Sequence, residues 1–208
     1  MESLEIKPVK DKKVTLYLIR NKNQRLINSQ LKNLKPFLEK EKFRFAILDF
    51  NKEEIKRSYR DAISKFLDKF WIPYYSIDIP DHVRDVLNVD IIEKEALMNE
   101  LEIEYANLCD DEDKKDSYKA QSLKIWIGLL KNEIESQRKA IELTIKPKWI
   151  VKKVLDIANM IRNDAFSIMY FTHEEIFSEL KMLFQNYNIK VKKIDINNIK
   201  IYLNKITI

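Results

Sequence analysis

The chain has 208 residues, of which 45% are apolar and 34% charged, a mixture typical of a soluble globular protein with a sizeable core. Its formal net charge of +5 is small and no nucleic-acid-binding motif is visible, which makes nucleic acid an unlikely partner. Gly128 is the only glycine. Phosphate-binding loops, dinucleotide fingerprints and nucleophile elbows all need glycine at sharp turns, so these three classes are effectively excluded.

Two short apolar runs near the N-terminus predict strands, at residues 14–19 and 43–48. Between them, leucines at helical spacing predict a helix over residues 28–40. Pro36 falls inside that helix and is expected either to kink it or to split it.

A second helical pattern over residues 55–70 leads into a third strand at residues 72–77. Residues 43–80 therefore form one βαβ unit, around which the other elements can be placed. Strands that alternate with helices predict a mainly parallel sheet covered by helices.

The strand patterns then stop, and residues 83–162 predict a helical insertion. Three helices are expected, at residues 93–108, 117–144 and 147–161, with a solvated acidic run at residues 110–116 between the first two. Such long helices should pack on one another as a hairpin or small bundle. Leu123, Trp126, Ile127 and Leu130 share one stripe, which predicts core or interface.

Strand patterns return at residues 165–171, and a helix follows with Thr172 as the predicted N-cap. Residues 189–196 and 199–206 flank Asn197-Asn198 and predict a terminal β-hairpin. The predicted fold is a three-layer α/β protein with a mainly parallel central sheet, a core of residues 1–82 and 163–208, and the insertion at 83–162.

Ligands of parallel sheets bind outside the carboxyl ends of the strands, so polar residues at those ends are the candidate site. These residues are Arg20, Asn21, Asp49, Asn51, Asp78, Asp81 and His82, joined by His173 after the fourth strand. Each also has an ordinary structural interpretation: Asp78 can cap a turn before Pro80, and His173 can simply open a helix.

Cys109 is the only cysteine, which rules out an internal disulfide and a cysteine-rich zinc site and suggests a reducing, cytoplasmic setting. No apolar run approaches 18 residues, so neither a signal peptide nor a membrane span is expected.

Four segments resemble the TraB family, the pheromone-shutdown proteins. Residues 46–51 resemble that family's strand ending in a glutamate, and residues 72–80 its strand ending in an aspartate. The segment 168–173 is similar to its second Gly-x-x-His strand, with His173 on the histidine and Tyr170 in place of the glycine. The first strand, ending at Arg20, occupies the place of the first Gly-x-x-His strand.

The resemblance implies an α/β core with a helical insertion and, in metal-dependent relatives, a hydrolase site. The first histidine and both motif glycines are absent, and the shorter Asp49 replaces the glutamate. The resemblance therefore implies a non-catalytic binding or regulatory module that requires no cofactor. Its partner would be another protein or a second copy, in a homodimer formed through the long helices. The alternative is a metal-dependent hydrolase with Asp49, Asp78 and His173 as catalytic residues and His173 and Asp49 holding zinc or manganese.

Overall fold

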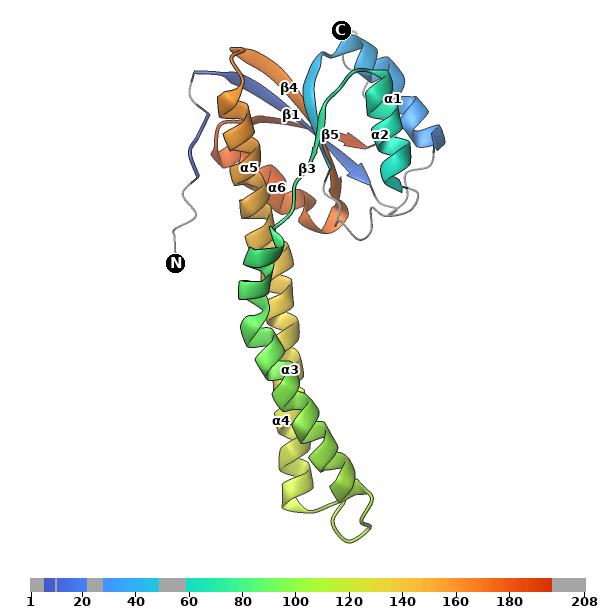
Figure 1. Ribbon diagram of the computed structural model, residues 1–208, viewed down its shortest axis with the longest axis vertical. Helices are drawn as coiled ribbons and strands as arrows, with labels where there is room; N and C mark the ends of the chain where they lie inside the picture. Colours follow the sequence, from blue (N-terminus) through green and yellow to red (C-terminus); the bar gives the residue numbers. More distant parts are fainter. Residues whose placement is uncertain (1–5, 10, 22–27, 49–58, 196–208) are drawn as a thin grey trace. The chain divides into compact units, whose positions relative to one another are not determined.

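The computed structural model describes residues 6–9, 11–21, 28–48 and 59–195 (Figure 1). The chain divides into two compact parts: an α/β part, made of residues 1–78 and 146–208, and a helical part, Ile79–Ile145. The α/β part is therefore built from two stretches of chain that are separated in sequence by the helical part.

The α/β part contains a five-stranded sheet in which all strand pairs are parallel. Its strand order is β3-β2-β4-β1-β5. The strands are β1 (Lys13–Asn21), β2 (Phe43–Leu48), β3 (Tyr74–Ser76), β4 (Ala165–His173) and β5 (Lys190–Asp195). The predicted parallel sheet is confirmed. The first strand of the expected C-terminal hairpin is β5, whereas its turn and its second strand, residues 196–206, lie outside the described residues.

Alternate residues of each strand face opposite sides of the sheet and build two separate cores. One core contains Tyr17, Ile19, Leu48 and Phe171 and is covered by α1 (Asn28–Lys40) and α2 (Tyr59–Lys69). The other contains Leu16, Leu18, Ile47 and Tyr170 and is covered by α5 (Lys146–Met160) and α6 (Glu174–Asn186). Figure 1 shows the two helix pairs on opposite faces of the sheet. The result is the three-layer α/β arrangement that the sequence predicts.

The crossovers of the sheet all have the same hand. From β1 through β2 to β3 the chain moves in one direction along the sheet, with α1 and α2 on one face. From β3 through β4 to β5 it moves back, with α5 and α6 on the other face. Reversing both the direction and the face preserves the handedness of the connection.

The helical insertion is shorter than the predicted 83–162. Its third helix, α5, belongs to the α/β part, because Ile150, Val151, Val154 and Leu155 are completely buried in the core on that face of the sheet. The helical part therefore ends at Ile145. Apolar residues at helical spacing cannot distinguish a helix that packs on helices from one that packs on a sheet, which explains the wrong boundary.

Two helices of the α/β part are followed by a residue in the left-handed conformation that is not glycine. After α2, Ile72 N–H bonds to Leu67 O (3.2 Å) and Trp71 N–H to Asp68 O (3.1 Å), the two bonds of a Schellman motif. Trp71 takes the left-handed position with φ of 54°, although its side chain is 92% exposed. Asn188, with φ of 61°, plays the same role after α6. Only asparagine is a common substitute for glycine at this position.

Three further residues in or beside the helices of the α/β part are Pro36, Thr172 and Lys12. Pro36 lies on the exposed side of α1, which continues through it without a break, so the proline does not split the helix. The predicted cap Thr172 is instead a buried residue of β4, and α6 begins directly after that strand at Glu174. The ammonium of Lys12 binds the last carbonyls of α5, those of Ala158 (3.1 Å) and Asn159 (2.8 Å) among them, where the helix dipole favours a cation.

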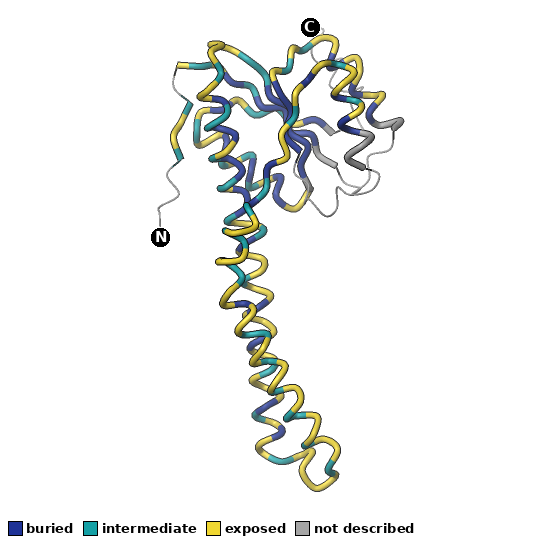
Figure 2. The backbone as a smooth tube through the Cα atoms, viewed as in Figure 1, coloured by how far each residue is buried: buried dark blue, intermediate teal, exposed yellow. Residues whose placement is uncertain are grey.

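The helical part is an antiparallel hairpin of α3 (Asp81–Cys109) and α4 (Tyr118–Ala140). Ser117 caps α4 by accepting a hydrogen bond from Ala120 N–H at 3.2 Å. A π-helical turn, Ile141–Ile145, follows α4 and precedes Pro147, whose missing N–H and bulky ring disturb the preceding turn. Figure 2 shows that much of the hairpin surface is exposed or only partly buried.

Candidate functional site

The carboxyl ends of the strands form a rim at which the predicted site residues can be located. Strand pairing places Arg20 opposite Thr172 and Asn21 opposite His173 on neighbouring strands β1 and β4. On the other side of β4, Leu48 of β2 pairs with Phe171. The ends of β1, β4 and β2 are therefore adjacent, as expected for a parallel sheet.

The structure fixes only part of the predicted site. The backbones of Arg20, Asn21 and His173 are placed, whereas the positions of their side chains are outside the description. Asp49 and Asn51 lie outside the described residues altogether. His173 is the last residue of β4, at the start of α6, so both the catalytic and the structural interpretation of this residue stay predictions.

Asp78 is the predicted site residue that the structure describes in most detail. Ile77 N–H bonds to Leu48 O (3.3 Å), which extends the pairing of β2 and β3 by one residue. Asp78 follows, and its Oδ1 lies 3.8 Å from Nζ of Lys146, the first residue of α5. The two side chains are only 16% and 10% exposed. The Asp78 carboxylate is therefore held beside a cation that the protein itself supplies, and a divalent metal ion would compete with this lysine.

The remaining predicted residues, Asp81 and His82, are the first two residues of α3 and belong to the helical part. Both are exposed, and they lie in the first turn of α3, which begins 12 residues before the predicted helix 93–108. Among the side chains that the structure describes, which do not include that of His173, no three of His, Cys, Asp or Glu are grouped so that they could hold a metal ion.

A polar contact between β1 and β5 in the α/β part was not predicted from the sequence. Tyr17 of β1 is almost completely buried, and Lys192 of β5 donates a hydrogen bond to its hydroxyl (2.9 Å). The same ammonium lies 4.9 Å from the centre of the Tyr17 ring. Burial, reinforced by a hydrogen bond with Glu41, raises the pKa of the Tyr17 hydroxyl well above its ordinary value. Since Tyr17 and Lys192 are 175 positions apart, no local pattern could have predicted their contact.

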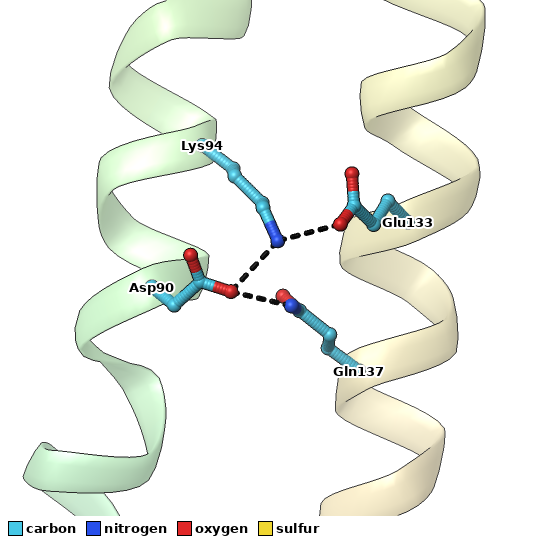
Figure 3. Close-up of polar contacts among 4 residues, drawn as sticks. All are labelled: Asp90, Lys94, Glu133 and Gln137. Atoms are coloured by element: carbon cyan, nitrogen blue, oxygen red, sulfur yellow. Dashed lines mark hydrogen bonds and ion pairs between the residues drawn. The ribbon is translucent and has the colours of Figure 1, made fainter.

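Polar bonds across the helical hairpin hold α3 and α4 together. Lys94 binds Asp90 on its own helix and Glu133 on α4, both at 2.7 Å, and Asp90 accepts a hydrogen bond from Gln137 (Figure 3). The ammonium of Lys94 and the amide of Gln137 lower the pKa of Asp90, and these carboxylates raise the pKa of Lys94. This network fixes the antiparallel register of the two helices.

Further ion pairs continue that register along the hairpin. Arg84 binds Glu142 at 2.6 Å, and Lys119 binds Glu104 at 2.5 Å. Arg138 also forms an ion pair with Glu95. Polar contacts therefore recur over most of the length of the two helices, although each exposed pair contributes little stability by itself.

The hairpin also exposes many large apolar side chains. Ile91 is the only residue of α3 that is fully buried, and the buried residues of α4 include Leu123, Leu130 and Ile134. The stripe of these residues was predicted to be core or interface; Leu123 and Leu130 are core, whereas Trp126 is 60% exposed. Other exposed apolar residues of the two helices are Val86, Val89, Ile92, Leu97, Ile103, Tyr118, Ile125 and Leu129. Exposed apolar surface of this kind is a common feature of binding sites.

Charge differs between the two parts of the chain. Residues 79–145 contain 16 acidic and 9 basic residues, a net charge of −7, whereas the other residues contain 17 acidic and 29 basic, a net charge of +12. The total of +5 hides this separation, and the even spread of lysine along the sequence does not reveal it. The helical part therefore has its own acidic character.

The fold defines an α/β protein with a helical hairpin inserted between β3 and α5. No helix among the described residues has the length and apolar character needed to cross a membrane. Searches found no matching family model, no matching curated protein and no matching solved structure.

Proposed function

We propose that the protein is a divergent relative of the TraB family that acts as a non-catalytic binding or regulatory module through its helical hairpin. The observation that carries the proposal is the exposure of large apolar side chains along α3 and α4, with Trp126 the largest of them on α4. Tryptophan is enriched among the residues that dominate binding energy at protein interfaces. The order of elements, a parallel α/β core with a helical insertion, supports the suggested kinship.

A metal-dependent hydrolase is the second candidate function. It is favoured by the strand register, because β4 ends at His173 beside β2, the strand that precedes Asp49. Asp78 follows the next strand, β3. In this hypothesis His173 and Asp49 hold a zinc or manganese ion and Asp78 acts as a base. The ion pair of Asp78 with Lys146 argues against that role, because the base would have to leave its cation.

Photo-crosslinking tests the binding function. A photoreactive phenylalanine analogue replaces Trp126 in one variant and Trp71 in a control, which lies in the α/β part and is 92% exposed. After irradiation in the cells that make the protein, mass spectrometry identifies the crosslinked chains. Specific products from position 126 and none from position 71 are expected. If further variants along the hairpin, at Ile103 and Ile125, also give no product, the proposal is wrong.

Metal analysis tests the hydrolase alternative separately. The purified protein is analysed for bound metal and its thermal melting is followed with and without added zinc or manganese. An ion that binds only the folded state raises the melting temperature, by mass action. Bound metal, together with a shift that Asp49→Asn and His173→Ala both abolish, would favour the hydrolase over the binding module.

A further inference from the structure

One side of the hairpin carries an exposed apolar pair between two polar clusters. Positions seven apart on a helix differ in direction by only about 20°. Asp90, Leu97 and Glu104 are therefore in line on α3. In the same way, Lys119, Trp126 and Glu133 are in line on α4.

The cross-helix bonds place these two lines on the same side of the hairpin. Glu104 at one end of the α3 line binds Lys119 of the α4 line. At the other end, Asp90 and Glu133 belong to one network, because both bind Lys94 (Figure 3). Leu97 and Trp126 are thus midway between the two polar clusters.

This side is here called the Leu97/Trp126 face. Leu97 is 46% exposed and Trp126 60% exposed. Leu129, three residues after Trp126 and 55% exposed, adjoins them on the surface of α4. An apolar centre with an exposed tryptophan, flanked by charged side chains, has the composition of an interface centre with its polar rim.

We propose that the Leu97/Trp126 face binds the same face of a second copy, so that two hairpins form a four-helix bundle. This inference rests on the proposed binding function and names the partner. Charge complementarity supports a second copy: α3 has eight acidic and two basic residues, whereas α4 has two acidic and five basic residues. Each hairpin therefore presents an acidic helix and a basic helix side by side.

The charges also select one of two symmetric arrangements. A twofold axis parallel to the helices places α3 of each copy against α4 of the other, with both hairpin tips at the same end. An axis perpendicular to the helices, lying between the two faces, instead places α3 against α3, which juxtaposes two acidic helices. Opposite charges attract and like charges cost several kcal/mol across an interface. The arrangement with both tips at one end is therefore the one we infer.

The available surface is large enough for a stable dimer. A helix of 23 residues, the length of α4, is about 35 Å long, and two packed helices are about 20 Å wide. One side of the hairpin therefore measures about 700 Å², close to the roughly 800 Å² per partner of standard interfaces. Leu97 and Trp126 lie near the middle of this area, where binding energy is usually concentrated.

Substitution of the apolar centre tests the interface. In the full chain, Trp126→Lys places a charge in the proposed contact, and Ile92→Lys is the matched control. Ile92 is 59% exposed on the same hairpin, but lies two positions before Lys94 and so points away from the face. Light scattering after size-exclusion chromatography at about 50 µM should find dimers for the native protein and for Ile92→Lys. Trp126→Lys should dimerise at least about 30-fold more weakly, as expected for a residue at the centre of an interface.

A distance measurement tests the arrangement of the two copies. Cys109, the only cysteine of the chain, is exposed at the end of α3 and accepts a spin label without further substitution. It lies 12 residues, or about 18 Å, along the helix from Leu97. With both tips at one end, the labels of the two copies should be about 15–25 Å apart. With the hairpins reversed, they should be about 35–40 Å apart.

The outcomes separate this inference from the proposed function. A native protein that stays monomeric at about 50 µM overturns the second copy as partner. Open-ended assembly, or a dimer that survives Trp126→Lys, overturns the Leu97/Trp126 face as the surface that joins the two copies. The longer label distance overturns the inferred arrangement of the two hairpins. If crosslinks from position 126 then identify a different protein, the binding function stands and only the self-association is wrong. Circular dichroism confirms that each variant is folded, so that loss of the dimer is not loss of the helices.

Discussion

The ion pair between Asp78 and Lys146 should stabilise the α/β part of the molecule. It joins the two residues at which the chain leaves this part and returns to it, since the helical part is Ile79–Ile145. Lys146→Met removes the ammonium but retains much of the apolar stem. The variant leaves the Asp78 carboxylate in surroundings where only 16% of its side chain is exposed. A carboxylate that loses its neighbouring cation in such surroundings is less well stabilised, so the variant should be less stable.

The geometry sets the size of the effect. At the observed 3.8 Å, two unit charges attract by about 4 kcal/mol at the effective dielectric constant of about 20 that suits protein sites. Removing both charges from water offsets part of this attraction. We therefore expect Lys146→Met to lower the free energy of unfolding by about 2–3 kcal/mol. The coupling energy between Asp78 and Lys146 should be smaller, about 1–2 kcal/mol. Part of the effect of Lys146→Met comes from the loss of contacts of Lys146 other than its ion pair with Asp78.

A double-mutant cycle measures this coupling. Native protein, Lys146→Met, Asp78→Asn and the double variant are unfolded in urea. Hydrogen exchange of β4 amides follows the α/β part by itself, since two compact parts need not unfold in one step. Lys148→Met, an exposed lysine two residues further along α5, is the control and should change stability by less than about 0.5 kcal/mol. If the two single effects add to within about 0.3 kcal/mol, Asp78 and Lys146 do not interact and the reasoning fails.

Three further predictions concern stability. Gly128→Ala in the middle of α4 should slow hydrogen exchange of the hairpin about fivefold, because alanine favours a helix by about 1 kcal/mol and the added methyl group meets no atom within 4 Å; unchanged exchange would contradict it. Trp71→Gly should raise the urea midpoint by relieving about 1 kcal/mol of left-handed strain at an exposed residue, and a lower midpoint would show that the indole packs. The raised pKa of Tyr17 implies stability that is complete below about pH 10, the ordinary tyrosine value, and is lost as the pH rises further. Urea unfolding at about pH 9 and about pH 11 should show this loss of stability for the native protein and not for Tyr17→Phe. If both proteins lose the same stability between these pH values, the loss does not come from Tyr17.

The α/β core could be predicted because its signals are local. The strands 14–19 and 43–48 are short apolar runs, and such runs separated by helices have few arrangements other than a parallel sheet. The end of the insertion was not predictable in this way. The apolar stripe of α5 is the same whether the helix packs on a sheet or on other helices, and only the three-dimensional contacts of Ile150 and Val154 decide.

The candidate site was predictable only as an edge of the sheet. The register confirms that His173 ends a strand next to Asn21, but the environment of Asp78 depends on Lys146, which is 68 positions away in the sequence. The partner of Tyr17 is similarly distant. Sequence spacing identifies which strand ends meet, whereas the charge beside each carboxylate depends on distant segments of chain.

The exposed apolar surface of the hairpin could not be predicted from the apolar residues of α3 alone. Helix α3 has apolar residues on several sides, so its pattern does not separate Ile91, which faces α4, from the exposed Leu97. The cross-helix ion pairs resolve this ambiguity, because they fix which side of each helix faces the other. Once Lys119 is paired with Glu104 and Lys94 with Glu133, Leu97 and Trp126 must share one side of the hairpin. The same polar residues that hold the hairpin together therefore define the apolar surface that it offers to a partner.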